Sequence, residues 1–191
     1  CYIPIGHNSK KSISKDIVLK KLKPLLEDPS IKKIGQNIKF DFIVLFKHGI
    51  NITSMEDTML MSYVLDAGKN RHNMDTLSEI HLGHKTISFK EIVGTGKKEI
   101  NFSDVEIDKA KDYAAEDADI TFRLYKKFIK NLKSEKMINI YEIFEKPLIK
   151  IIALMEIEGV QIDSKFLKSL SSKFGKKITK LEKEIFKISK K

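Results

Sequence analysis

Two carboxylates of this sequence each follow, by four residues, a polar side chain that could work with them. Asn37 precedes Asp41, and Tyr113 precedes Asp117. Residues i and i+4 share one face of a helix, so each spacing brings its two side chains together if the segments are helical. Asp117 lies on an apolar stripe and Asp41 borders another, and a buried carboxylate is costly without a partner. In a chain with few arginines, two such acids suggest a shared metal ion.

Carboxylate oxygens suit Mg²⁺ or Mn²⁺. Two such ions, about 4 Å apart, can activate water and stabilise the leaving oxygen in phosphodiester hydrolysis. A tyrosine one helical turn from a metal-binding aspartate, as Tyr113 is from Asp117, can orient the attacking water. Asp41 and Asp117 alone are too few to hold two ions. Each motif by itself also fits a buried aspartate that accepts hydrogen bonds at a helix N-terminus.

Other kinds of site find little support in the sequence. The segment 94–97 is too short for a phosphate-binding loop. The only cysteine is Cys1, so we expect no disulfide and a reducing, cytoplasmic setting. No apolar run reaches the length of about 18 residues that suggests a membrane-spanning helix. The histidines lack the spacing of zinc ligands with cysteines; they are His7, His48, His72, His81 and His84.

The positive charge is concentrated at the C-terminal end. The 191 residues carry a net charge of +10, and 41% of them are hydrophobic. Residues 164–191 contain ten lysines and two glutamates, which gives +8 for this segment and leaves +2 for the rest. A basic segment favours contact with phosphate backbones. The alternative is a solvated helix face in a generally lysine-rich protein.

The hydrophobic pattern predicts strands that alternate with helices, which is typical of an α/β fold. We expect strands over 1–5, 31–34 and 51–55, and helices over 15–26, 37–48, 58–65, 76–82 and 103–132. Asp57 and Asp75 are expected to cap the helices that follow them. Residues 86–102 are expected to form a loop with one short helical turn. From residue 138 the pattern predicts a second, helical unit, a turn over 158–163, and after Ser164 one amphipathic helix or two that break at Gly175.

Several segments resemble, in order, those of the bacterial DNA polymerase I family of family A polymerases. The run 35–41 resembles the second exonuclease motif of that family, and the run 113–119 resembles the third. Between them, 57–60, 71–75 and 84–89 are similar to the intervening segments. After them, 155–163 resembles the entry to the polymerase domain, and the amphipathic helix resembles the start of its thumb. The resemblance covers essentially the whole chain.

This resemblance implies a ribonuclease-H-like 3′–5′ exonuclease domain over 1–135 and the beginning of the polymerase domain, with base and thumb helices, over 136–191. It implies a two-metal site for Mg²⁺ or Mn²⁺ that includes Asp41 and Asp117, with Tyr113 positioning the nucleophilic water. The implied partners are the single-stranded 3′ end of DNA and primer–template DNA. The implied setting is a monomer in the bacterial cytoplasm, associated with the nucleoid. The residues that match the single-strand channel are Gln36, Asn37, Met59, Arg71, His72 and Phe89.

General chemistry agrees with part of this assignment. Arginine suits a phosphate contact, as proposed for Arg71. Phe89 offers a face on which an unpaired base can stack. Ordinary core packing is the alternative for Phe89 and Met59.

The sequence departs from the family pattern at two points. Phe40 occupies a position where tyrosine is often found. The first exonuclease motif, an Asp-x-Glu that precedes the position of Tyr2 in the family, is absent, so two of the four metal carboxylates are missing and we expect little nuclease activity from this chain by itself. The chain begins with Cys1 at an expected strand and ends inside a helical pattern, so we expect a fragment cut at both ends. Two alternatives stay open: a catalytically silent exonuclease-like scaffold, and a 3′–5′ exoribonuclease of the ribonuclease D type.

Overall fold

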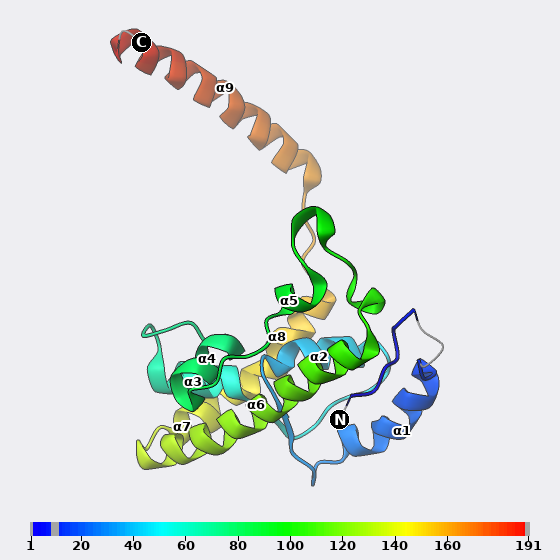
Figure 1. Cartoon of the computed structure of the whole chain (residues 1–191). Coiled ribbons are helices and arrows are strands. Elements are labelled where there is room, and N and C mark those ends of the chain that lie inside the picture. Colours follow the sequence, from blue (N-terminus) through cyan, green and yellow to red (C-terminus); the bar gives the residue numbers. More distant parts are fainter. Residues whose placement is uncertain (1, 9–11, 190–191) are drawn as a thin grey trace. The chain divides into compact units, whose positions relative to one another are not determined.

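The computed structural model describes residues 2–8 and 12–189, apart from the side chain of Lys97. The chain divides into two compact units, Cys1–Ile157 and Glu158–Lys191, which are described separately. The elements of the first unit are α1 (Lys15–Glu27), β1 (Lys33–Gly35), α2 (Ile38–Phe46), β2 (Met55–Asp57), α3 (Thr58–Asp66), α4 (Met74–Leu82), α5 (Phe89–Val93), the 3₁₀ turns η1 (Gly96–Lys98) and η2 (Phe102–Asp104), α6 (Ile107–Ser134), α7 (Ile138–Ile140), the π-helical η3 (Tyr141–Glu145) and α8 (Lys146–Glu158) (Figure 1).

A small parallel sheet fixes where two of the helices begin. Strands β1 and β2 pair in parallel, with Lys33 opposite Met55 and Gly35 opposite Asp57. Parallel neighbours require a crossover connection, and α2 provides it. The carboxyl ends of both strands therefore meet at one edge, and α2 and α3 both start there. The first unit is mostly helical around this sheet, which agrees with an α/β class at the coarse level.

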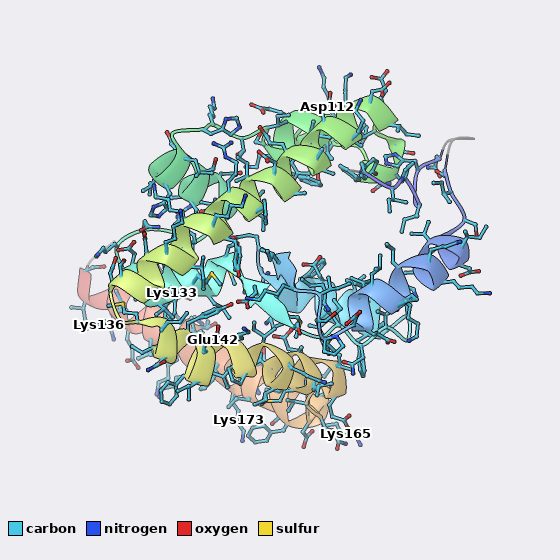
Figure 2. All side chains as sticks on the ribbon, turned by 90° about the horizontal axis from the view of Figure 1, so that it is seen from below. Asp112, Lys133, Lys136, Glu142, Lys165 and Lys173 are labelled. Carbon is cyan, nitrogen blue, oxygen red and sulfur yellow. The ribbon has the colours of Figure 1, made fainter. Side chains whose placement is uncertain are left out.

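Helix α6 carries the largest part of the core. It is 28 residues long, and Figure 2 shows Asp112 toward one of its ends and Lys133 toward the other. Its apolar positions recur every four residues, as expected for a helix with one buried stripe. The main core cluster consists of Met61, Leu65, Leu77, Ile120, Leu124, Phe128, Leu132 and Tyr141. Two smaller clusters lie apart from it: Phe42, Ile52 and Ala153 in one, and Val93, Val105 and Ala110 in the other.

The second unit contains α9 (Ser164–Ser189), which is one continuous helix. Gly175 does not interrupt it, so the single-helix alternative is confirmed. The Asp163 carboxylate accepts hydrogen bonds from the backbone N–H groups of Lys165 and Phe166, at 3.0 and 2.9 Å, and thereby caps the helix. No helix in the described part of the chain is long and apolar enough to cross a membrane.

The predicted strand over 1–5 is wrong for residues 2–5, and Cys1 lies outside the described residues. The backbone of this segment bonds to loops instead of to a neighbouring strand. The Pro4 carbonyl accepts from the Ile13 N–H at 2.7 Å, and the Asn8 N–H donates to the Ser103 carbonyl at 3.0 Å. A strand needs a pairing edge, and here the partners are loop segments.

Other predicted boundaries shift by a few residues. Strand β1 begins later than expected, because Ile31 is part of a turn closed by a 3.3 Å hydrogen bond to the Asp28 carbonyl. The strand predicted over 51–55 is wrong for residues 51–54, since β2 begins at Met55. Helix α6 begins at Ile107, because residues 102–104 form a 3₁₀ turn. Asp75 does not cap α4: Asn73 holds that position, and the Asp75 carboxylate accepts from the Thr86 hydroxyl at 2.7 Å. The predicted cap at Asp57 is confirmed.

Candidate active site

Helix α2 carries Asp41 in its first turn. The buried side chains of Ile38 and Phe42 anchor the helix to the core. Asn37, just before the helix, adopts a left-handed conformation with φ of 58°. Asp41 itself is exposed, at the rim of an open cavity. The anchored apolar side chains thus turn the carboxylate toward this cavity.

Helix α6 carries Tyr113 and Asp117 one turn apart. Buried Ala110 and Ile120 flank this stretch of the helix. The Oδ1 atom of Asp117 is buried and has no hydrogen-bond partner within the part of the chain that the structure describes. Buried carboxylate oxygens normally have a partner, so this atom is available to a ligand that brings positive charge or a hydrogen-bond donor.

Asp41 and Asp117 line the same cavity, although they are 76 positions apart in the chain. The cavity has a volume of about 660 Å³ and is also lined by Gln36, Thr121 and Leu45. One wall comes from β1 and α2, and the other comes from α6. The cavity is the place where the structure brings the two predicted metal-site carboxylates together.

Both carboxyl groups resist ionisation. Burial raises the pKa of Asp117 from 3.8 to about 6; the nearby Tyr113 hydroxyl lowers it, and the negative charges of Glu116 and Asp75 raise it further. Surrounding protein atoms also raise the pKa of Asp41, although part of that residue faces solvent, and the charge of Asp57 adds to the effect. A bound cation would reverse both shifts.

The donor chemistry of this cavity fits a divalent cation, but the set of donors is partial. Asp41 and Asp117 supply hard oxygen ligands, and the buried Oδ1 atom of Asp117 has no hydrogen-bond partner among the described residues. Among the described residues, no group of three or more His, Cys, Asp or Glu side chains is placed to hold a metal ion. The two carboxylates can therefore contribute to a metal site without completing it.

Tyr113 belongs to a triangle of aromatic rings. Its ring centre lies 6.1 Å from that of Phe89 and 6.2 Å from that of Phe102. The rings of Phe89 and Phe102 stack on each other, with their centres 6.0 Å apart. His7 packs against Phe102 with ring centres 5.7 Å apart, and its Nδ1 atom contacts the Val105 carbonyl at 3.1 Å. Burial, followed by the charge of Asp117, raises the pKa of Tyr113 to about 12. The hydroxyl of Tyr113 therefore stays protonated near neutral pH.

The residues predicted to contact nucleic acid fall into separate groups. The Gln36 amide donates to the His72 carbonyl at 2.7 Å, and the His72 ring contacts the Ser62 hydroxyl at 2.9 Å. Asn37 and Met59 line a second cavity of about 180 Å³, on the side of α8. Arg71 and Phe89 are exposed. Gln36 is the member of this set that lines the cavity of Asp41 and Asp117.

Three residues that no sequence pattern marks as part of a site also shape this region. Glu116 accepts from the Ile87 N–H at 2.7 Å and contacts the His84 Nε2 atom at the same distance, so it holds a loop against α6. Phe102 supports Tyr113 from a loop that has no periodic pattern. Asp57 was expected only as the cap of α3. For Glu116, the one signal in the sequence is its position beside Asp117.

A family of proteins described as 3′–5′ exonuclease matches residues 1–133. Curated relatives named DNA polymerase I include those of Rhizobium leguminosarum, 45% identical over 168 residues, Pseudomonas aeruginosa, 38% over 192 residues, and Borreliella burgdorferi, 37% over 187 residues. These alignments cover 88%, 97% and 97% of this chain, but only 16%, 21% and 20% of the relatives. The chain thus spans about a fifth of the length of the relatives it matches. Its match over residues 1–133 makes it a member of this 3′–5′ exonuclease family.

Proposed function

We propose that this chain forms part of a DNA polymerase I, in which it contributes to a proofreading exonuclease that hydrolyses 3′-terminal nucleotides of DNA. The observation that carries the proposal is the shared cavity of Asp41 and Asp117, in which the Oδ1 atom of Asp117 has no hydrogen-bond partner within residues 2–8 and 12–189. The names of the relatives support the substrate and the polymerase context.

In the proposed mechanism, Asp41 and Asp117 would hold a divalent cation, Mg²⁺ or Mn²⁺. When bound, such an ion supplies positive charge that activates water and stabilises the leaving oxygen of a phosphodiester. Tyr113, which stays neutral, orients the attacking water through its hydroxyl and does not act as a base. The exposed face of Phe89 stacks on an unpaired base at the 3′ end. Arg71 contacts phosphate, and Gln36, Asn37, Met59 and His72 border the strand.

We also propose a ribonuclease-H-like fold for residues 1–135 and the beginning of the polymerase domain for residues 136–191. The parallel pair β1–β2 with its helical crossover supports the first assignment. The amphipathic, lysine-rich α9 supports the second, because it offers charge to the backbone of primer–template DNA. The protein would work as a monomer in the bacterial cytoplasm, close to the nucleoid.

The test uses the full-length natural protein that carries this sequence. Asp41→Ala and Asp117→Ala are each expected to weaken Mn²⁺ binding and to abolish nucleotide release from single-stranded DNA. Asp119→Ala is the matched control, because Asp119 lies on the same helix with its side chain 64% exposed and paired with Arg123 at 3.6 Å. If the unchanged protein neither binds Mn²⁺ nor releases nucleotides, the chain belongs to a scaffold and the proposal is wrong.

Two further comparisons define the substrate and the role of this chain. DNA and RNA oligonucleotides of one sequence are offered to the full-length protein, and faster cleavage of RNA would favour a ribonuclease D type of activity. The 191-residue chain by itself is expected to release few or no nucleotides, because it offers two carboxylates to the metal. Release by this chain that disappears in Asp117→Ala would contradict that expectation.

A further inference from the structure

The carboxylate of Asp57 accepts hydrogen bonds from the beginnings of two helices. The residue ends β2 and is 1% exposed. Its Oδ1 atom accepts from the N–H groups of Met59 at 2.9 Å and Leu60 at 3.4 Å, in the first turn of α3. Oδ1 also accepts from Asn37 at 3.0 Å, and Oδ2 accepts from Ile38 at 3.0 Å, where α2 begins.

The parallel register explains why one side chain can reach both helices. Gly35 and Asp57 lie opposite each other at the ends of β1 and β2, so α2 and α3 leave from neighbouring points. The first N–H groups of a helix have no partner within the helix, and a carboxylate there also complements the helix dipole. Asn37 adopts φ of 58°, in the left-handed region that is uncommon for residues other than glycine but that asparagine adopts more readily than most. Its hydrogen bond to Asp57 helps to hold it there.

A second set of contacts fixes Asp57 from the other side. Its backbone N–H donates to the Tyr141 hydroxyl at 2.9 Å, and that hydroxyl donates to Glu56 Oε2 at 3.0 Å. Lys146 donates to Glu56 Oε1 at 2.8 Å. Tyr141 is fully buried in the π-helical η3, and π-helical turns often occur at functional sites. Tyr141 and Lys146 both lie beyond residues 1–133, the part matched by the exonuclease family.

We infer that Asp57 is a positioning residue for Asp41, and that the Tyr141 hydroxyl keeps Asp57 in place. Helix α2 has only nine residues, and Asp41 lies in its first turn. The N–H groups that Asp57 holds therefore set the direction of the turn that presents Asp41 to the cavity shared with Asp117. This inference rests on the proposed function, because the metal site gives the position of Asp41 its effect.

Two substitutions separate positioning from a general loss of stability. Asp57→Ser keeps a good cap for α3, since serine is favoured at that position. Its single hydroxyl oxygen cannot also accept the hydrogen bonds from Asn37 and Ile38 at the start of α2. Tyr141→Phe leaves the buried ring in place and removes only the hydroxyl. The control is Leu77→Ala, which opens a cavity in the core cluster that contains Tyr141 and touches none of these hydrogen bonds.

The measurements are made on the full-length natural protein and its variants. Amide hydrogen exchange at Asn37 and Ile38 reports on the start of α2 without metal, and Mn²⁺ titration reports on the site. For Asp57→Ser we expect faster exchange at both amides, Mn²⁺ affinity lower by about tenfold, as for residues that orient metal ligands, and a lower kcat with KM little changed. Tyr141→Phe should change the same quantities in the same direction but by less than Asp57→Ser, because the Tyr141 hydroxyl contacts the backbone of Asp57 and reaches α2 only through it. Leu77→Ala should lower the melting temperature and leave the Mn²⁺ affinity unchanged.

The outcomes distinguish this inference from the proposed function. Unchanged exchange and Mn²⁺ affinity in Asp57→Ser would overturn the inference, as would a loss of affinity in Leu77→Ala that matches its loss of stability. Unchanged amide exchange and Mn²⁺ affinity in Tyr141→Phe would show that the Tyr141 hydroxyl does not hold Asp57 in place. If the protein without substitutions does not bind Mn²⁺, the proposed function fails. Amide exchange at Asn37 and Ile38 then still decides whether Asp57 holds the start of α2.

Discussion

Tyr113 and Asp117 lie one helical turn apart on α6, and each changes the acidity of the other. The charge of Asp117 adds to the burial that raises the pKa of Tyr113 to about 12. The Tyr113 hydroxyl in turn lowers the pKa of Asp117, which burial still brings to about 6. Near neutral pH the pair therefore combines a neutral hydroxyl with an ionised carboxylate, and the ionisation of that partly buried carboxylate lowers the stability of the fold.

Because the ionised Asp117 lowers the stability of the fold, we expect Asp117→Asn to stabilise the metal-free protein. The pKa of Asp117 rises from 3.8 in the unfolded chain to about 6 in the fold, so the folded state binds more protons between these values. Stability thus falls as the pH rises from 3.8 to 6, and one pKa unit corresponds to about 1.4 kcal/mol. Because solvent screens part of this effect at a partly exposed side chain, we expect Asn to add about 1–2 kcal/mol above pH 6 and little below pH 4.

The measurement is denaturation in EDTA at several pH values, with Asp119→Asn as the control on the same helix. Asp119 is largely exposed, so its substitution should change stability by less than about 0.5 kcal/mol at any of these pH values. An equal gain for Asp117→Asn at pH 4 and pH 7 would show that ionisation is not the cause.

Phe89→Ala should weaken the binding of single-stranded DNA. Phe89 is 49% exposed and stacks on Phe102 from one side, so its outer face is free for a base. The loss of one stacked base corresponds to about 1–3 kcal/mol of binding free energy. The matched control is Phe122→Ala, because Phe122 is 45% exposed on α6 but lies beside Lys126 instead of the aromatic triangle. Fluorescence anisotropy with a labelled oligonucleotide makes the comparison, and equal losses would exclude a specific role for Phe89.

Lys146→Met should destabilise the fold, because it removes a partner of the buried Glu56. Glu56 is 2% exposed. In the variant, its remaining partners would be the Tyr141 hydroxyl and the largely exposed Lys32, whose Nζ atom lies 3.5 Å from Glu56 Oε1. Breaking a buried ion pair costs about 3–5 kcal/mol, and the partial exposure of Lys146 places the effect at about 2–3 kcal/mol. The double variant Glu56→Gln with Lys146→Met should recover most of this loss.

A double-mutant cycle by urea denaturation measures this recovery. Lys23→Met serves as the control, because the pair of Lys23 with Glu27 is exposed and should contribute less than about 1 kcal/mol. If the double variant is as unstable as the sum of its single variants, Glu56 and Lys146 do not act as a pair.

The lysines of α9 should make DNA binding depend on salt. Lys176, Lys180 and Lys183 line one stretch of that helix. Each phosphate that a lysine contacts adds about 0.9 to the slope of log affinity against log salt concentration. Replacing all three by Gln should reduce this slope by up to about 3. Replacing three lysines of α1 by Gln makes the same change in net charge, and an equal effect there would mean that charge alone, and not α9, matters.

The sequence predicts those parts of the site that depend on local periodicity. The spacing from Tyr113 to Asp117 is a property of any helix, and the structure places the pair on one. Gly83 ends α4 in the left-handed conformation that favours glycine at such a position. These features need no knowledge of where other segments lie.

Contacts set by strand register or by loops leave no local pattern in the sequence. The bonds from Asn37 and Ile38 to Asp57 require the parallel pairing of Gly35 with Asp57, which no local pattern reveals, whereas the cap bonds from Met59 and Leu60 are local. Phe102 meets Tyr113 from a stretch without periodicity. Residues 2–5 have the composition of a strand, but a strand forms only where a neighbouring edge accepts its hydrogen bonds.

The unequal packing along α6 has a consequence for how the protein responds to heat. At 1.5 Å per residue the helix is about 42 Å long. From Ile120 onward the helix packs into the main core cluster through Ile120, Leu124, Phe128 and Leu132, whereas its first turns contact a small cluster through Ala110. Regions with few buried contacts open at lower free energy than the rest of a fold. The turn that carries Tyr113 should therefore fray while the main core is intact, so that warming disables this end of the helix before the protein unfolds.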